Sequence, residues 1–384
     1  MNGARPPVVR RAPGKLFVAG EYAVVEPGGA AILVAVDRHI TATVTEPAAG
    51  PGVLLSSDLA AAPVRWRWRE GRLDPVGAAD PARTRRELAH VVAAVETVAR
   101  LLAEHGRPEL ELDLAISSRL HQDGVKFGLG SSGAVTVATV AAVAAYAGLA
   151  LSAEQRYRLA LLASAGLDPK GSGGDLAAST WGGWIAYRSP DRTAVLDLAR
   201  RRGVAGALAE PWPGFAVRRL PPVPGLALEV GWTGTPASTA DLVSGLHRRG
   251  PRGTPAHRRY TAAAEDVVRA AAEAFEQGDR PGLLEQIRCA RRELARLDDA
   301  VGLGVFTPAL TALCEAAEAV GGAAKPSGAG GGDCGIALLD TAHGGTTDSG
   351  TADASPDIDQ LRERWAAAGV RPLALRPALE GNEE

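Results

Sequence analysis

The chain has 384 residues, 46% of which are hydrophobic, and its 42 Lys and Arg residues nearly balance its 44 Asp and Glu residues. This apolar content suffices for buried cores, so a wholly disordered chain is excluded, and the length predicts two domains. The formal net charge of -2 provides no overall positive field for nucleic acid or an anionic membrane surface. Any anion must therefore be bound at a local site.

Cysteine usage and the apolar segments predict a cytoplasmic protein. Cys289, Cys314 and Cys334 form no C-x-x-C pair, so neither a disulfide framework nor a zinc site is expected. Residues 1–15 lack the continuous apolar segment of a secretory signal. The uncharged stretch 127–153 is mostly Ala, Gly, Ser and Thr, which favours a buried helix over a membrane span. We expect no nucleic-acid or membrane partner, and a monomer or a homodimer.

In the first half of the chain, hydrophobic periodicity predicts both strands and helices. The expected strands cover residues 16–19, 32–45, 110–116 and 184–187, and the expected helices cover 83–105, a segment from 134, and 153–165. The proline-rich segment 210–225 is interpreted as a connection between domains. The predicted domains are therefore residues 1–220 and 221–384.

The second half continues the same mixture. Its expected strands are 226–232 and 335–339, its expected helices are 260–275, 282–298 and 308–319, and a last helix and strand lie within 358–375. The polar insert 341–356 is expected to be a mobile surface loop. The elements do not alternate regularly enough for a doubly wound sheet, so the predicted class is α+β.

The lysines have an unusual distribution. Only four of the 42 basic residues are lysines, and each lies beside a glycine-containing turn: Lys15, Lys126, Lys170 and Lys325. A lysine presents a compact point charge, whereas arginine presents a planar fork. This placement indicates sites for phosphate.

Three glycine-rich segments carry the chemistry. Gly128-Leu-Gly-Ser-Ser-Gly133 opens a helix, so its backbone N–H groups can converge on an anion. A dinucleotide site is excluded because the polar segment 121–126 is no buried strand, and no Walker A motif occurs. Residues 170–175 and 325–333 each place an aspartate after a glycine turn. Together the three loops predict convergence on one polyphosphate.

These segments resemble the signatures of a known enzyme family. Residues 13–25, 128–133, 171–180 and 325–333 are similar, in order, to motifs of the GHMP kinases, which include galactokinase, homoserine kinase, mevalonate kinase and phosphomevalonate kinase. The resemblance spans nearly the whole chain, and residues 126–133, 171–184 and 231–239 look most like bacterial phosphomevalonate kinases. It implies an α+β, two-domain GHMP-kinase-like fold with ATP and acceptor in the interdomain cleft.

The resemblance also implies residue roles, with ATP and Mg²⁺ as cofactors. Catalysis is assigned to Lys15, Lys126 and Asp175, and Mg²⁺ binding to Ser132 and Asp175. The expected ATP-phosphate ligands are Gly128, Gly130, Ser131, Ser132 and Gly133. The expected acceptor ligands are Lys15, Glu21, Tyr22, Lys170, Ser172, Ser327, Gly328, Ala329 and Gly330. Mevalonate kinases carry a Mg²⁺-binding Glu where this chain has Ser164, so phosphates, water, Ser132 and Asp175 hold the ion or the metal site differs.

The chemistry of the acceptor separates the closest functions. A hydroxyl acceptor needs an aspartate to accept or steer a proton. A phosphate monoester, whose second pKa is about 6, is largely ionised at neutral pH and needs cations instead. Lys15, Lys126 and Lys170 are expected to supply them. The lysines favour conversion of 5-phosphomevalonate to 5-diphosphomevalonate; mevalonate kinase, diphosphomevalonate decarboxylase and a catalytically silent ligand-binding relative remain as alternatives.

Several residues also have structural interpretations. Asp175 and Asp333 could each cap a turn, and this capping role is favoured for Asp333. Glu21 could pair with a lysine in the site or lie on a solvated turn. Tyr22 could touch the acceptor or pack under the first glycine loop. The seven histidines show no metal-ligand spacing, and none is assigned a catalytic role.

Overall fold

The computed structural model describes residues 5–48, 50–58, 62–122, 125–236, 242, 253–342 and 356–382. The larger of its sheets draws its strands from the first 220 residues and has the order β10-β9-β2-β6-β3-β4-β5, with β1 paired to β2. The strands are β1 (Val8–Ala19), β2 (Ala30–Thr45), β3 (Val53–Ser57), β4 (Val64–Arg69), β5 (Arg72–Val76), β6 (Leu112–Ser118), β9 (Trp184–Arg188) and β10 (Ala216–Leu220). A short hairpin, β7 (His121–Gln122) and β8 (Val125–Lys126), precedes the first glycine loop.

Strand β2 is the centre of this sheet. Its first part pairs with β9, its second part pairs with β6, and β1 runs antiparallel along most of its length. Residues 32–36 form an uninterrupted apolar run and are fully buried, as expected for a strand covered on both faces. Lys15 and Glu21 lie on β1 and just after it, so β2 supports this edge of the site.

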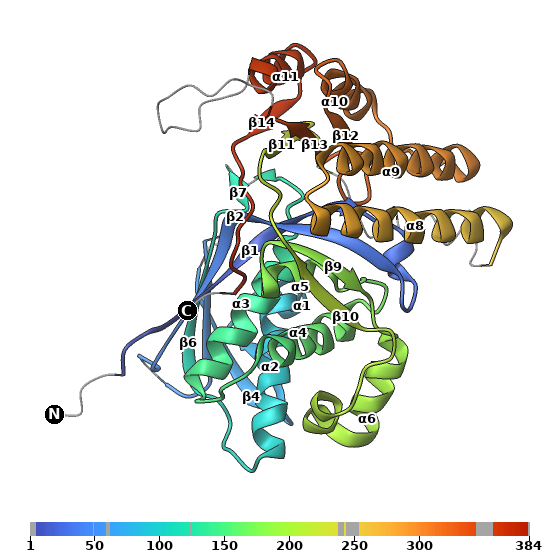
Figure 1. The fold of residues 1–384 in the computed structure, drawn as a ribbon. Helices are drawn as coiled ribbons and strands as arrows, with labels where there is room; N and C mark the ends of the chain where they lie inside the picture. The colour runs from blue at the N-terminus through green and yellow to red at the C-terminus, as the bar shows by residue number, and fades with distance from the viewer. Residues whose placement is uncertain are drawn as a thin grey trace.

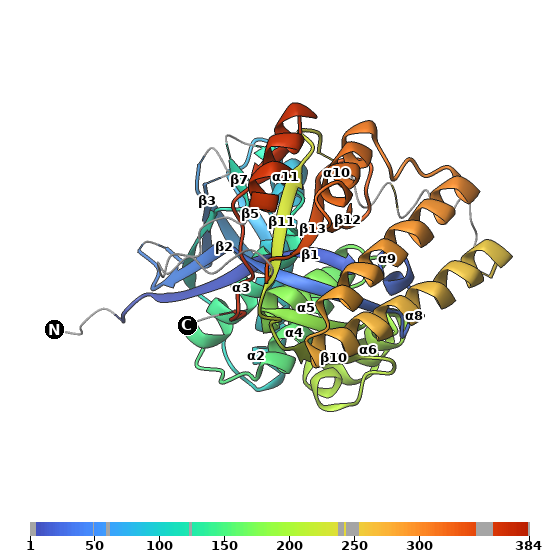
Figure 2. The same cartoon turned by 45° about the horizontal axis from the view of Figure 1, so that its top comes forward.

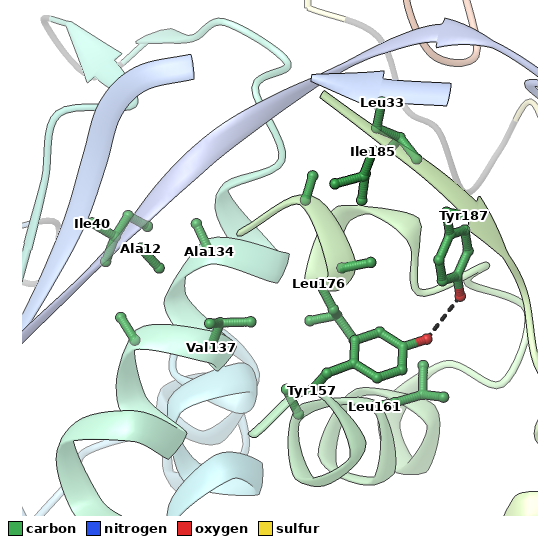
Figure 3. Packing of buried hydrophobic residues seen from close by; sticks show 14 of the residues in the cluster. Ala12, Leu33, Ile40, Ala134, Val137, Tyr157, Leu161, Leu176, Ile185 and Tyr187 are labelled. Carbon is green, nitrogen blue, oxygen red and sulfur yellow. Dashed lines mark hydrogen bonds between the residues drawn. The ribbon is translucent and has the colours of Figure 1, made fainter. Parts of the chain in front are cut away.

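Helices pack on one face of the larger sheet (Figure 1). They are α1 (Pro81–Glu87), α2 (Ala89–Glu104), α3 (Ser131–Tyr146), α4 (Ala153–Leu167), α5 (Gly174–Trp181) and α6 (Arg192–Ala209). Figure 3 shows Val137 of α3, Leu161 of α4 and Leu176 of α5 in one core below Leu33 and Ile185. Helix α3 is built mainly of Ala, Val, Thr and Gly, whose small side chains allow close packing on β1 and β2.

The second half forms a smaller antiparallel sheet with helices. Its strand order is β12-β13-β11-β14, with β11 (Leu226–Trp232), β12 (Ala323–Pro326), β13 (Cys334–Asp340) and β14 (Arg371–Leu373). The helices are α8 (Pro255–Gln277), α9 (Arg280–Val301), α10 (Pro308–Glu318) and α11 (Pro356–Ala367). The side chains of Thr254, Asp279 and Thr307 cap the N-termini of α8, α9 and α10, and each helix has a proline in its first two positions. Local sequence therefore determines where these helices begin. Figure 2 shows α8 and α9 lying side by side.

The C-terminal residues return to the larger sheet. Pro377 forms a β-bridge with Val36, and the Ala378 N–H donates to the Ala35 carbonyl at 2.9 Å. Figure 1 shows this last segment running from the smaller sheet back to the first half. The two halves are therefore joined by the segment after β10 and by the chain end.

The predicted α+β class is confirmed, whereas some predicted elements are wrong. The helix expected at 83–105 is broken at Leu88 into α1 and α2, and the expected connection 210–225 contains β10. Strands β3, β4, β5, β7, β8 and β12 and helices α5 and α6 are absent from the prediction. The insert 341–356 lies mostly outside the described residues. Among the described residues, no helix is long and apolar enough to cross a membrane.

Candidate active site

A cavity of about 550 Å³ brings the three glycine loops together. Its wall combines residues of the first half with Pro236, Gly328, Ala329 and Asp333 of the second half. Most of the predicted site residues line it: Lys15, Glu21, Tyr22, Lys126, Gly128, Gly130, Ser131, Ser132, Lys170, Ser172, Asp175, Gly328 and Ala329. Gly133, Ser327 and Gly330, which were also predicted, are not among the residues that line it.

The first glycine loop requires glycine for both conformation and space. Gly128 and Gly130 have φ of 75° and 77°, and Gly130 is the N-cap of α3. A Cβ on Gly128 would lie 2.5 Å from Asp333 Cγ, and one on Gly130 would lie 2.8 Å from Lys15 Cε. The loop is thus held between Lys15 and Asp333, with the N-terminus of α3 facing the cavity.

Lys15 is fixed by its backbone next to this loop. Its N–H donates to the Leu129 carbonyl at 2.8 Å, and its ammonium donates to the Gly128 carbonyl at 3.5 Å. The ammonium also lies 5.2 Å from the centre of the Phe17 ring. A register shift between Pro13 and Gly14 interrupts β1 just before Lys15. The positive charge is therefore presented directly at the loop that was predicted to bind phosphate.

Asp175 stands in the first turn of α5, next to the first turn of α3. Gly173, with φ of 78°, is the N-cap of α5. A Cβ on Gly133 would come within 2.5 Å of Asp175 Oδ2, so the two helix starts pack closely. The Ser179 hydroxyl donates to the Pro13 carbonyl at 2.7 Å and ties α5 to β1. Two helix N-termini, which favour negative charge, therefore meet at one wall of the cavity.

Lys126 and Lys170 add further positive charge to the cavity. Both side chains are exposed, Lys126 at the end of β8 and Lys170 in the turn before α5. The Lys170 N–H donates to Asp168 Oδ1 at 2.9 Å, and Asp168 also lines the cavity. The structure thus places Lys15, Lys126 and Lys170, the three lysines predicted to act together, around the same cavity.

The third glycine loop contacts the segment after β1. The Tyr22 hydroxyl donates to the Ala329 carbonyl at 2.5 Å, so Tyr22 packs against the third loop and not under the first. Burial, with the negative charges of Asp298 and Glu21, raises the pKa of Tyr22 and keeps it a neutral donor. Ser327 Oγ accepts from the Phe17 N–H at 2.8 Å and donates to the Phe17 carbonyl at 3.0 Å. Ser327 thus joins the two halves.

The expectation that every lysine serves a phosphate site is wrong for Lys325. Its side chain is fully buried, and its ammonium forms an ion pair with Glu21 and donates to the Pro326 carbonyl at 2.6 Å. Of the two alternatives for Glu21, pairing with a lysine is the one observed. The position beside a glycine turn could not reveal this, because the partner lies 304 residues away in sequence.

His90 lines the cavity although no histidine was singled out from the sequence. Its Nδ1 lies 3.4 Å from Thr136 Oγ1, and the Thr136 hydroxyl donates to the Ser132 carbonyl at 2.7 Å. Burial lowers the pKa of His90, and the smaller charge effects of Asp175 and Lys126 oppose each other. Asp333 is both in a turn, with φ of 51°, and in the cavity wall. No spacing signal in the sequence marks His90. Ser164, the position at which mevalonate kinases carry a Mg²⁺-binding Glu, also lines the cavity.

Known proteins match the chain over most or nearly all of its length. Residues 89–183 match the GHMP kinases N-terminal domain, and residues 271–369 match the GHMP kinases C-terminal domain. A phosphomevalonate kinase from Streptomyces sp. (strain CL190) is 64% identical, covering 99% of this chain and 100% of that protein. A mevalonate kinase from Aeropyrum pernix is 29% identical, covering 85% of this chain and 87% of that protein.

Solved structures agree with these matches. The Lin0012 protein from Listeria innocua has a TM-score of 0.85 and 32% identity, with 99% of this chain and 100% of that chain covered. Streptococcus pneumoniae phosphomevalonate kinase in complex with phosphomevalonate and AMPPNP has a TM-score of 0.81 and 27% identity, with 97% and 100% covered. The two matched domains hold the three glycine loops of the cavity wall, and the chain belongs to the GHMP kinase family.

Proposed function

We propose that the protein transfers the γ-phosphoryl group of ATP to 5-phosphomevalonate, giving 5-diphosphomevalonate and ADP. The carrying observation is the cavity in which the N-termini of α3 and α5 meet beside Lys15, Lys126 and Lys170. Support also comes from the 64% identity to a phosphomevalonate kinase over its full length and from the likeness to a relative solved with phosphomevalonate and AMPPNP.

The transfer needs charge neutralisation more than proton abstraction. An oxygen of the acceptor phosphate forms the new bond to the γ-phosphorus while the bond from the β–γ bridging oxygen breaks, and ADP leaves. Because the acceptor's second pKa is about 6, that oxygen is largely ionised at neutral pH. The lysines bring the two anions together, and the helix N-termini hold the polyphosphate. Asp175 acts by positioning the reacting groups.

The residues present fit a Mg²⁺ ion held mainly by substrate phosphates. Mg²⁺ usually binds through one or two carboxylates, phosphates and water. The Asp175 carboxylate packs on Gly133. Gly133 directly follows Ser132, which carries the hydroxyl. The described residues contain no group of three or more His, Cys, Asp or Glu able to hold a metal ion. We therefore assign Asp175 and Ser132 as the protein ligands; Mg²⁺ would neutralise phosphate charge.

An ADP-release assay with purified protein tests the function. Mevalonate, 5-phosphomevalonate and 5-diphosphomevalonate are supplied in parallel, with an acceptor-free reaction as the control for ATP hydrolysis. Of the three acceptors, only 5-phosphomevalonate is expected to give turnover above this control. Faster turnover with mevalonate would indicate a hydroxyl acceptor, and release of CO₂ and phosphate from 5-diphosphomevalonate would indicate a decarboxylase. If none of the three acceptors supports ADP formation, the result would favour a binding protein. Cytoplasmic location and a monomeric or dimeric state stay predictions.

A further inference from the structure

A buried ion pair joins the two halves at the cavity wall. Glu21 follows β1 and is 3% exposed, and Lys325 on β12 is 0% exposed. The Lys325 ammonium contacts the Glu21 carboxylate and the Pro326 carbonyl. Glu21 lines the cavity, whereas Lys325 is not among the lining residues. The lysine therefore acts on the cavity through the carboxylate that it neutralises.

Neutral donors and further acids surround this pair. The Tyr260 hydroxyl of α8 donates to the Glu21 backbone carbonyl at 2.6 Å. Burial raises the pKa of Tyr260, so it brings no positive charge. Glu293 acts on Tyr260, and Asp298 acts on Tyr22, and both are acidic. The cation in direct contact with the Glu21 carboxylate is the Lys325 ammonium, whereas Arg291 acts with Lys325 on Cys314 on the far side of the pair from Tyr22 and pairs with Glu318.

The balance matters for an anionic ligand. A carboxylate without a counter-charge in a desolvated wall repels an incoming anion more strongly than it would in water, because the effective dielectric constant is low. The acceptor in the proposed function carries both a phosphate and a carboxylate group. The same wall includes Tyr22 and Ala329, which contact each other across the two halves.

We infer that Lys325 determines acceptor specificity by neutralising Glu21, so that this wall accepts a ligand carrying several negative charges. This inference rests on the proposed function and extends it to a residue outside the cavity. It gives Lys325 a positioning and electrostatic role, although the side chain touches neither substrate.

A charge-pair cycle tests the inference. Binding of 5-phosphomevalonate and of AMPPNP is measured by calorimetry at pH 8, which favours the ionised form of carboxyl groups. Lys325→Met should weaken 5-phosphomevalonate binding about tenfold or more, with a smaller change for AMPPNP. Removing both charges in Glu21→Gln/Lys325→Met should restore binding at least several-fold relative to Lys325→Met alone. A purely structural ion pair instead predicts that Lys325→Met weakens AMPPNP binding as much as 5-phosphomevalonate binding, because an unpaired buried charge destabilises the fold as a whole.

A second ion pair with a buried carboxylate provides a control away from the cavity, although its cation is half-exposed. Arg362 of α11 donates twice to the buried Glu229 carboxylate of β11, at 2.9 Å and 2.9 Å, and neither residue lines the cavity. Arg362→Met and Glu229→Gln/Arg362→Met should leave the affinity for 5-phosphomevalonate unchanged. If Lys325→Met does not fold, Glu21→Gln alone decides, because it removes the negative charge and keeps Lys325. Acceptor binding at least as tight as in the wild type is then expected.

The outcomes separate the inference from the proposed function. Wild-type protein that binds no 5-phosphomevalonate would overturn the proposed function itself. Wild-type binding combined with a double variant as weak as Lys325→Met would overturn only the role of Lys325, as would weaker binding by Glu21→Gln. Unchanged acceptor affinity in Lys325→Met would have the same meaning.

Discussion

Gly130 lies directly against the side chain of Lys15, so that a Cβ at position 130 would be 2.8 Å from Lys15 Cε and 2.9 Å from its Cγ. The φ of 77° at Gly130 adds a conformational requirement to this steric one. The residue that opens α3 and the lysine of β1 thus shape the phosphate loop together. Any larger residue at position 130 must displace Lys15 and strain the loop.

We predict that Gly130→Val weakens AMPPNP binding about 100-fold or more, because strain and displacement of Lys15 act together. Calorimetric titration measures the change. Gly148→Ala is the matched control, since Gly148 also has positive φ, 71°, but has no atom within 4 Å of a Cβ. It should lose some stability and keep nucleotide affinity. Normal AMPPNP binding by Gly130→Val would rule out the phosphate-loop assignment.

Ser132→Ala should lower turnover and raise the Mg²⁺ concentration needed for half-maximal rate about tenfold, because one oxygen near the ion is lost. The fold should persist, since the hydroxyl is no part of the core. Ser131→Ala, one position earlier in the same cavity wall, should change ATP affinity without changing the Mg²⁺ requirement. An unaltered Mg²⁺ dependence in Ser132→Ala would remove Ser132 from the metal site.

Lys126 and Asp175 should respond differently to substitution. With a phosphate acceptor, Lys126→Met loses a charge that counters two approaching anions and should cost on the order of 10²–10³ in kcat. Asp175→Asn should lower kcat less than Lys126→Met does. The pH-rate profile should show no acidic limb that depends on the Asp175 carboxylate. Both variants are measured across pH at saturating ATP. A far larger loss for Asp175→Asn, with the acidic limb abolished, would indicate a hydroxyl acceptor instead.

The lowered pKa of His90 predicts a stability effect at mildly acidic pH. An unfolded histidine has a pKa of about 6.5, so below that value the unfolded chain binds more protons at this site than the native chain. The free energy of unfolding should therefore fall as pH decreases below 6.5, down to the folded pKa. Urea unfolding from pH 7.5 to 5.5 measures this slope, which His90→Gln should reduce. His105→Gln, at the exposed end of the same helix, should not change it.

Much of the site could be predicted from local sequence. Gly128 to Gly133 followed by an Ala-rich helix, and Gly173 and Gly174 before Asp175, specify turns and helix starts through φ preferences and N-terminal N–H groups. The resemblance of these segments to the GHMP kinases is confirmed by the domain matches. The local signal is weaker for the elements that the prediction missed. Strands β4 and β5 are short, and α5 starts inside a glycine-rich segment that resembles a loop.

The sequence by itself determined the family, the α+β class, the glycine loops and the charge available to an anionic substrate, because these depend on local chain geometry and composition. Tertiary structure decided which of those charges face the substrate. Lys15 and Lys325 both lie beside glycine turns, but β1 presents Lys15 to the cavity, whereas β12 buries Lys325 against Glu21. The use of a lysine depends on partners hundreds of residues away, because a buried charge must be paired with the carboxylate that the fold brings to it.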